Sequence, residues 1–124
     1  MRATKLIAAL SFLAALLSYT QLHADKTSVT LECPDRAAPG TEITIRVNVA
    51  HHGNNFLHYT DLVQVNVNGT EIARWSFSAF SRPEAENFSR EVKYRVTAPG
   101  EITAMGNCNI HGSTGSVSRR IAVP

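Results

Sequence analysis

The feature that most constrains the fold of this chain is an apolar side chain at every second position of residues 41–49. Ile43, Ile45, Val47 and Val49 are apolar, and the residues between them are polar or charged. Successive side chains of a strand point to opposite faces, so this alternation predicts a strand with one buried face. A helix would need apolar residues three or four positions apart, and no stretch after residue 24 shows that spacing.

Further segments with β character follow along the same chain, separated by turn signals. We expect strands over residues 26–33, 59–67, 70–80, 88–98, 101–106 and 116–123. Asn68-Gly69 is typical of a tight two-residue hairpin, and Pro99-Gly100 of a turn. About seven short strands at this spacing predict an all-β domain, an immunoglobulin-like antiparallel β-sandwich.

The first 24 residues have the layout of a secretory signal peptide. A basic start with Arg2 and Lys5 precedes an apolar run over residues 6–17, and cleavage is expected after Ala24. The run is shorter than the ~20 residues that span a membrane, although an uncleaved anchor is the alternative. We therefore expect a signal peptide over residues 1–24 and one exported, periplasmic domain over residues 25–124.

The charge balance argues against a nucleic-acid partner. The whole chain carries 12 basic and 10 acidic side chains. Arg2 and Lys5 belong to the expected signal peptide, which has no acid, so the domain keeps ten of each sign. A near-neutral domain gives no reason to expect nucleic acid or an anionic membrane as a partner.

Metal-binding residue types are concentrated in two short windows, residues 51–59 and 106–112. These windows hold four of the five histidines and one of the two cysteines. A sandwich gathers its loops at its ends, so the windows can meet, and imidazole and thiolate bind iron, copper or zinc. We expect His52, His58, Cys108 and His111 to hold one metal ion. Adjacent strand residues point oppositely, so His51 would join His52 only through irregular backbone.

A disulfide is the main alternative use of the cysteines. Cys33 and Cys108 are the two cysteines of the chain, and an exported compartment favours their oxidation. A bond between them would make the protein a stapled structural sandwich without a metal.

The order of these motifs resembles the iron domain of superoxide reductases, also called neelaredoxins or desulfoferrodoxins. The resemblance covers residues 28–123 and is carried by His52-x5-His58-Tyr59, the hairpin at Val65–Gly69, and Cys108-Asn109-x-His111-Gly112. It implies an immunoglobulin-like fold and a ferrous ion with equatorial histidines and an axial thiolate. His52, His58 and His111 match equatorial ligands, Cys108 matches the axial sulfur, and a sixth position is open.

The resemblance also implies a reaction and its partners. Superoxide would be reduced to hydrogen peroxide, and an external electron donor would restore the iron. The expected partners are therefore superoxide, an unspecified electron donor, and a second copy of the chain if it oligomerises.

One part of the family pattern is missing from this sequence. The family usually adds a further equatorial histidine from an N-terminal segment, beside a glutamate and a lysine. Residues 25–124 contain no Glu-Lys-His segment, and His23 falls in the expected signal peptide. Iron would then be held by three histidines and a cysteine, or His51 would supply the missing imidazole. Otherwise the protein is an exported metal-binding or electron-transfer module without efficient superoxide turnover.

Overall fold

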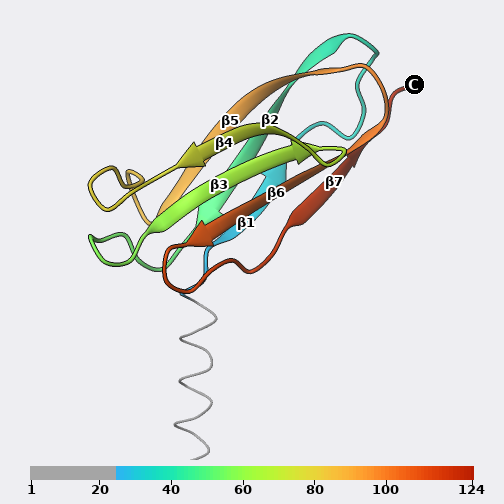
Figure 1. The fold of residues 1–124 in the computed structure, drawn as a ribbon. Helices are drawn as coiled ribbons and strands as arrows, with labels where there is room; N and C mark the ends of the chain where they lie inside the picture. The colour runs from blue at the N-terminus through green and yellow to red at the C-terminus, as the bar shows by residue number, and fades with distance from the viewer. Residues whose placement is uncertain (1–24) are drawn as a thin grey trace, which may run out of the picture.

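The computed structural model describes residues 25–124, which form seven strands (Figure 1). The strands are β1 (Ser28–Glu32), β2 (Thr41–Ala50), β3 (Thr60–Val67), β4 (Thr70–Ser76), β5 (Asn87–Val96), β6 (Gly100–Cys108) and β7 (Val117–Ile121). The described part of the chain has no helix long and apolar enough to span a membrane. The expected signal peptide, residues 1–24, lies outside the described residues.

The strands form two antiparallel sheets that pack face to face. One sheet has the order β1-β2-β5 and the other β4-β3-β6-β7. The longest pairing joins β2 to β5, from Thr41 opposite Val96 to Ala50 opposite Asn87. This arrangement confirms the prediction of an all-β, immunoglobulin-like sandwich of about seven strands.

The core lies between the sheets and follows the alternation in the sequence. Ile45 and Val47 of β2 are fully buried, as are Val63 and Val65 of β3 on the opposite layer. Each such side chain contributes ~1.5–3 kcal/mol by leaving water. The side chains between them point outward, so the period of two sets which face of each sheet becomes the core.

Two strands end at different residues from those expected. β4 ends at Ser76, not at Phe80. The Phe77 amide still donates to the Asp61 carbonyl of β3, but the chain then closes a turn between Ser78 and Ser81 and leaves the sheet. β6 continues to Cys108 because β3 still pairs with it there, with Thr60 opposite Cys108. Cys108 is therefore the last residue of a central strand instead of a loop residue.

One end of the sandwich collects the segments that carry metal-binding side chains. The end of β2, the start of β3 and the end of β6 all lie at this end (Figure 1). The chain preceding β1 joins them, because the Thr27 amide donates to the Gly112 carbonyl and the Thr114 amide donates to the Thr27 carbonyl. Buried Thr27 also hydrogen-bonds buried Thr60 through the two hydroxyls, 3.0 Å apart.

Candidate metal centre

His51 faces the interior because it extends the alternation of β2. Val47 and Val49 are buried, Ala50 is exposed, and His51 directly after the strand is only 4 % exposed. The next residue, His52, is exposed. The same two-residue period that builds the core thus directs one histidine inward and its neighbour outward.

Three ligand-type side chains converge on one point. The ligand atoms of His51, His58 and Cys108 all lie within 4.8 Å of one another. They come from both sheets, since His51 follows β2 and Cys108 ends β6. A cluster of two imidazoles and a thiol has the chemistry of an iron, copper or zinc site.

His111 joins this group from the loop after β6. Its Nδ1 lies 3.1 Å from His58 Nε2 and 3.9 Å from Cys108 Sγ. The loop returns on itself because the Cys108 amide donates to the Gly112 carbonyl and the Gly112 amide donates back. Gly112 has φ of 81°, a backbone conformation that glycine adopts without strain.

The Cys108 sulfur is buried and held by backbone donors. The residue is 1 % exposed, and its Sγ accepts the His111 amide at 3.4 Å and the Ile110 amide at 3.5 Å. Amide donors aimed at a sulfur stabilise its thiolate and tune a metal bound to it. The loop after Cys108 therefore supplies both a ligand and the electrostatic environment of the sulfur.

His51 has one nitrogen satisfied and one without a partner. Its Nε2–H donates to the Asp25 carbonyl at 2.9 Å, which leaves Nδ1 as an acceptor. Nδ1 is buried and makes no hydrogen bond, which costs about 1–3 kcal/mol. Burial is also the main reason that the pKa of His51 is lowered, which favours the neutral imidazole. A ligating histidine has this pattern, one N–H fixed by a carbonyl and the other nitrogen free for a metal.

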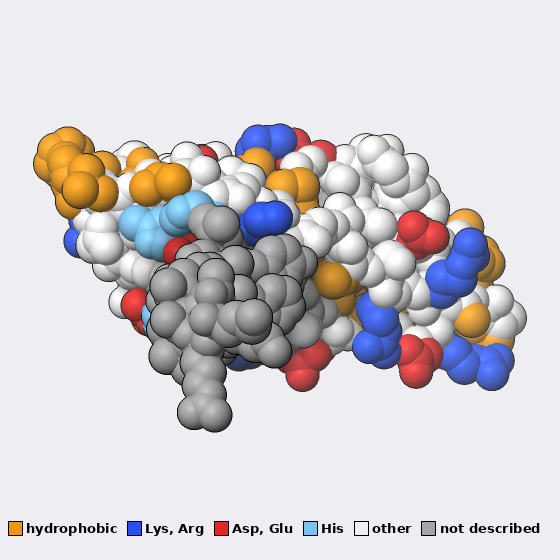
Figure 2. Space-filling model, turned by 90° about the horizontal axis from the view of Figure 1, so that it is seen from below, with side chains coloured by type: hydrophobic (Ala, Val, Ile, Leu, Met, Phe, Trp, Pro, Cys, Tyr) orange, Lys and Arg blue, Asp and Glu red, His pale blue; other side chains and the backbone are white. Residues whose placement is uncertain are grey.

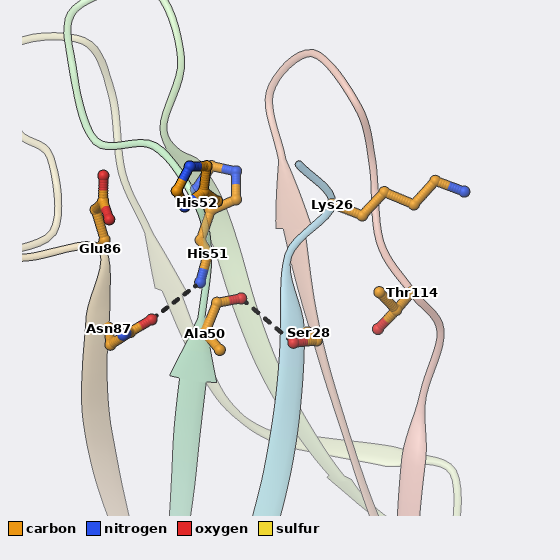
Figure 3. Close-up of a pocket in the computed structure, with 8 residues that line it drawn as sticks. All are labelled: Lys26, Ser28, Ala50, His51, His52, Glu86, Asn87 and Thr114. Carbon is orange, nitrogen blue, oxygen red and sulfur yellow. Dashed lines mark hydrogen bonds between the residues drawn. The ribbon is translucent and has the colours of Figure 1, made fainter. Parts of the chain in front are cut away.

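A surface pocket of about 350 Å³ opens beside His51 (Figure 3). Its walls include Lys26, His52, Glu86 and Thr114. The backbone beneath is fixed because the His51 amide donates to Asn87 Oδ1 at 3.3 Å. Of the clustered residues only His51 lines this pocket, whose walls carry one lysine and one glutamate.

The structure brings three of the four predicted ligands together, and His51, the possible further ligand of the sequence analysis, makes a group of four. His58, Cys108 and His111 lie within one cluster, with His51 beside them. His52 is exposed at the pocket and is not part of the group. The sequence signal for His51 is its position two residues after Val49, which continues the alternation of buried residues in β2.

The two cysteines are both free. Thr27 lies against the Cys108 loop. Cys33 comes six residues later, directly after β1, and an extended chain of that length places it ~20 Å from Thr27. A disulfide needs the two Cα atoms within ~7 Å. The geometry therefore excludes a disulfide between Cys33 and Cys108, and with it the disulfide-linked structural sandwich. The pKa of the Cys33 thiol is raised, chiefly by burial, so this cysteine stays protonated.

Both the sequence and the fold of this chain are similar to those of known proteins. The sequence model described as desulfoferrodoxin matches residues 20–114. Among solved structures, a superoxide reductase (neelaredoxin) from Ignicoccus hospitalis has a TM-score of 0.67 at 20 % identity, covering 80 % of this chain and 83 % of that one. The reduced form of the Archaeoglobus fulgidus superoxide reductase has a TM-score of 0.53 at 18 % identity, covering 77 % and 89 %.

The same sandwich also occurs in proteins with other names. The sulfur carrier protein SoxY from Chlorobium limicola has a TM-score of 0.56 at 11 % identity, covering 77 % of this chain and 78 % of that one. At such identities the structural likeness establishes the fold alone. No curated protein sequence matches this chain.

Proposed function

The chain belongs to the desulfoferrodoxin family, and on that premise we propose that it is a superoxide reductase-like oxidoreductase with one non-haem iron. Cys108, His58 and His111 would hold the iron, as the motif predicts. His51 would be the further imidazole, taking the place that the family fills from an N-terminal segment. His52, which the motif spacing also predicts as a ligand, is exposed beside the same pocket.

One observation carries this assignment. His51 presents a buried Nδ1 with no hydrogen-bond partner, in a group whose ligand atoms lie within 4.8 Å of one another. Without a metal, this nitrogen would remain buried and unsatisfied in the folded protein. A soft thiolate together with neutral imidazoles is a donor set that suits iron.

Iron bound there would supply the electron that, with two protons, converts superoxide to hydrogen peroxide. The protein contributes the surroundings of that reaction. Lys26 on the pocket wall would attract the anionic substrate, and Glu86 on the same wall would oppose it. The amides of Ile110 and His111 hold the sulfur in place, and the Asp25 carbonyl fixes the ring of His51.

The proposal is tested by loading the full chain with iron and oxidising it. We expect one iron per chain and a thiolate-to-ferric charge-transfer band that Cys108→Ser abolishes. Superoxide consumption with an added reductant should exceed that of the same concentration of free iron. An oxidised, iron-loaded protein without the band would refute the assignment.

A second candidate is a metal-binding or electron-transfer module without efficient turnover. It is favoured by the absence of a Glu-Lys-His segment from residues 25–124. This alternative predicts the same band but superoxide consumption no faster than free iron, so the rate measurement separates the two.

The compartment is part of the same proposal. Residues 1–24 have the sequence pattern of a secretory signal, so we place the domain outside the cytoplasm, in the periplasm. Amino-terminal sequencing of the protein from its cells should start at Asp25. A start at Met1 would mean that the segment is retained.

A further inference from the structure

Four large apolar side chains are exposed at the end of the sandwich that carries the metal-binding cluster. Their exposed fractions are 52 % for Phe56, 72 % for Leu57, 91 % for Phe80 and 59 % for Ile110. The rings of Phe56 and Phe80 meet edge to face, with centroids 5.1 Å apart. Figure 2 shows hydrophobic side chains gathered at one tip of the molecule, next to the histidines. We call these four residues the apolar tip.

The apolar tip is built into the loops that hold the candidate ligands. Phe56 and Leu57 directly precede His58, and Ile110 lies between Cys108 and His111. Asn109 ties the two loops together, because its Nδ2 donates to the Leu57 carbonyl at 3.1 Å and its Oδ1 accepts the Tyr59 amide at 3.0 Å. A molecule on the tip is therefore held at a fixed position relative to the cluster.

The tip also offers a short path to the sulfur. The amide of exposed Ile110 donates to Cys108 Sγ at 3.5 Å. A partner that touches Ile110 is thus one residue and one hydrogen bond from the buried sulfur. None of the four tip residues lines the pocket beside His51, so a partner on the tip leaves that pocket free for a small substrate.

The size of the tip indicates what kind of partner fits. From their exposed fractions the four side chains present on the order of 500 Å². Covering this area on both partners buries ~1,000 Å², less than the ~1,200–2,000 Å² of a stable complex and within the range of transient electron-transfer encounters. The nearby exposed charges, Arg82, Glu84 and Glu86, are of mixed sign, so steering by charge is weak.

We propose that the apolar tip is the docking surface of a one-electron donor protein, an inference that rests on the proposed function. The donor is a small redox protein whose own centre lies near its surface among apolar side chains. In the encounter the reduced donor loses one electron and becomes oxidised, and the oxidised iron centre gains that electron. No bond is formed or broken, and no proton is required.

Binding is tested first on the metal-free full chain. Phe80→Trp places a fluorophore on the tip, and a small soluble c-type cytochrome is the probe, because its haem quenches tryptophan emission. We expect saturable quenching beyond that of native Trp75 in the unsubstituted chain. Leu57→Ser in the same background should weaken binding about 10-fold, as loss of a well-covered contact does, and the matched Leu57→Met should not. Absent quenching, or quenching unaffected by Leu57→Ser, would overturn the proposal.

Electron delivery is tested on the iron-loaded chain by following the loss of the ferric band. We expect Leu57→Ser/Phe80→Ser to slow reduction by the reduced cytochrome about 10-fold, with little dependence on salt. Reduction by ascorbate should be unchanged, and Leu57→Met/Phe80→Leu should keep the original rate. A double serine variant that takes electrons from the cytochrome as fast as the original chain would refute the docking role.

The controls separate this proposal from its premise and its rivals. If superoxide fails to oxidise the ferrous form in every variant, the proposed function fails while the binding result stands. If phosphatidylcholine–phosphatidylglycerol vesicles shift the emission of the Phe80→Trp variant to the blue and prevent quenching, the tip binds lipid and the docking proposal is wrong. If sedimentation shows a dimer that the double serine variant loses, the tip binds a second copy and the proposal is again wrong.

Discussion

His51 and His52 are adjacent in the chain and experience opposite environments. One ring is buried with a free Nδ1, and the other is exposed at the pocket. The pair is therefore a matched test of which imidazole binds metal. His51→Gln should weaken iron binding by more than the ~10–100-fold that follows loss of a residue supporting a ligand, whereas His52→Gln should change it little. Competition with a chelator measures both, and the reverse order would assign the site to His52.

The burial of His51 also predicts how the metal-free protein responds to acid. Because burial lowers the pKa of the folded imidazole, the unfolded chain binds a proton more readily below the ordinary histidine pKa of ~6.5. The free energy of unfolding should be constant with respect to this group above that pH and fall as the pH drops from there through the folded pKa. Urea unfolding at a series of pH values should show a weaker fall in His51→Gln than in the original chain.

At the scale of the strand, periodicity determined much of what the sequence could predict. The alternation over residues 41–49 gave the position and buried face of β2, and Asn68-Gly69 gave the hairpin, with φ of 49° and 80° as a tight type I′ turn requires. The end of β4 was mispredicted, because Phe77 and Phe80 continue an apolar pattern after the strand has stopped. Phe80 is exposed on the apolar tip, and a local apolar pattern does not distinguish an exposed aromatic residue from a buried one.

Gly106 of β6 lies against Thr27 and Val29, two residues before the Cys108 ligand. A Cβ there would lie 2.6 Å from Thr27 Cγ2 and 3.1 Å from Val29 Cγ1. Gly106→Ala should therefore destabilise the fold by ~1–3 kcal/mol through overpacking, measured by urea unfolding. Thr27→Ser removes the Cγ2 but keeps the hydroxyl that bonds Thr60, so the double variant should recover part of the loss. Strictly additive effects would show that the two groups do not meet.

At the scale of the whole molecule, the candidate centre joins the two sheets. His51 follows a strand of the three-stranded sheet, and Cys108 ends a strand of the four-stranded one. A metal at 100 times its Kd would stabilise the folded state by ~2.7 kcal/mol, which for ~100 residues raises Tm by ~10–20 °C. Calorimetry with iron and then with a chelator should show this rise and its reversal. The shift in Tm should vanish in Cys108→Ser. An iron-independent Tm in the original chain would contradict a metal that joins the two sheets.

The candidate site was less predictable than the fold because its parts meet only after folding. The motif spacing identified His58, Cys108 and His111, which the loop geometry then brought together. The role of His51 depends on the Asp25 carbonyl, which reaches its ring across 26 positions of sequence. The free Cys33 likewise follows from strand direction, since β1 carries it away from the cluster. The alternation of β2 predicts that His51 faces inward, but neither its contact with Asp25 nor the separation of Cys33 from Cys108 leaves a local pattern in the sequence.

The contact between Asp25 and His51 has a practical consequence for anyone producing the protein. Whatever is fused ahead of Asp25 starts beside the ring that the Asp25 carbonyl holds. A hexahistidine tag at that position would offer competing imidazoles at the mouth of the centre and distort any measured stoichiometry. The carboxyl terminus follows β7, whose last residue, Ile121, pairs with Gly100 of β6 (Figure 1). Gly100 is eight residues before Cys108 in the same strand, a distance of ~26 Å. An affinity tag after Pro124 that binds no metal itself would leave the measured iron stoichiometry unbiased.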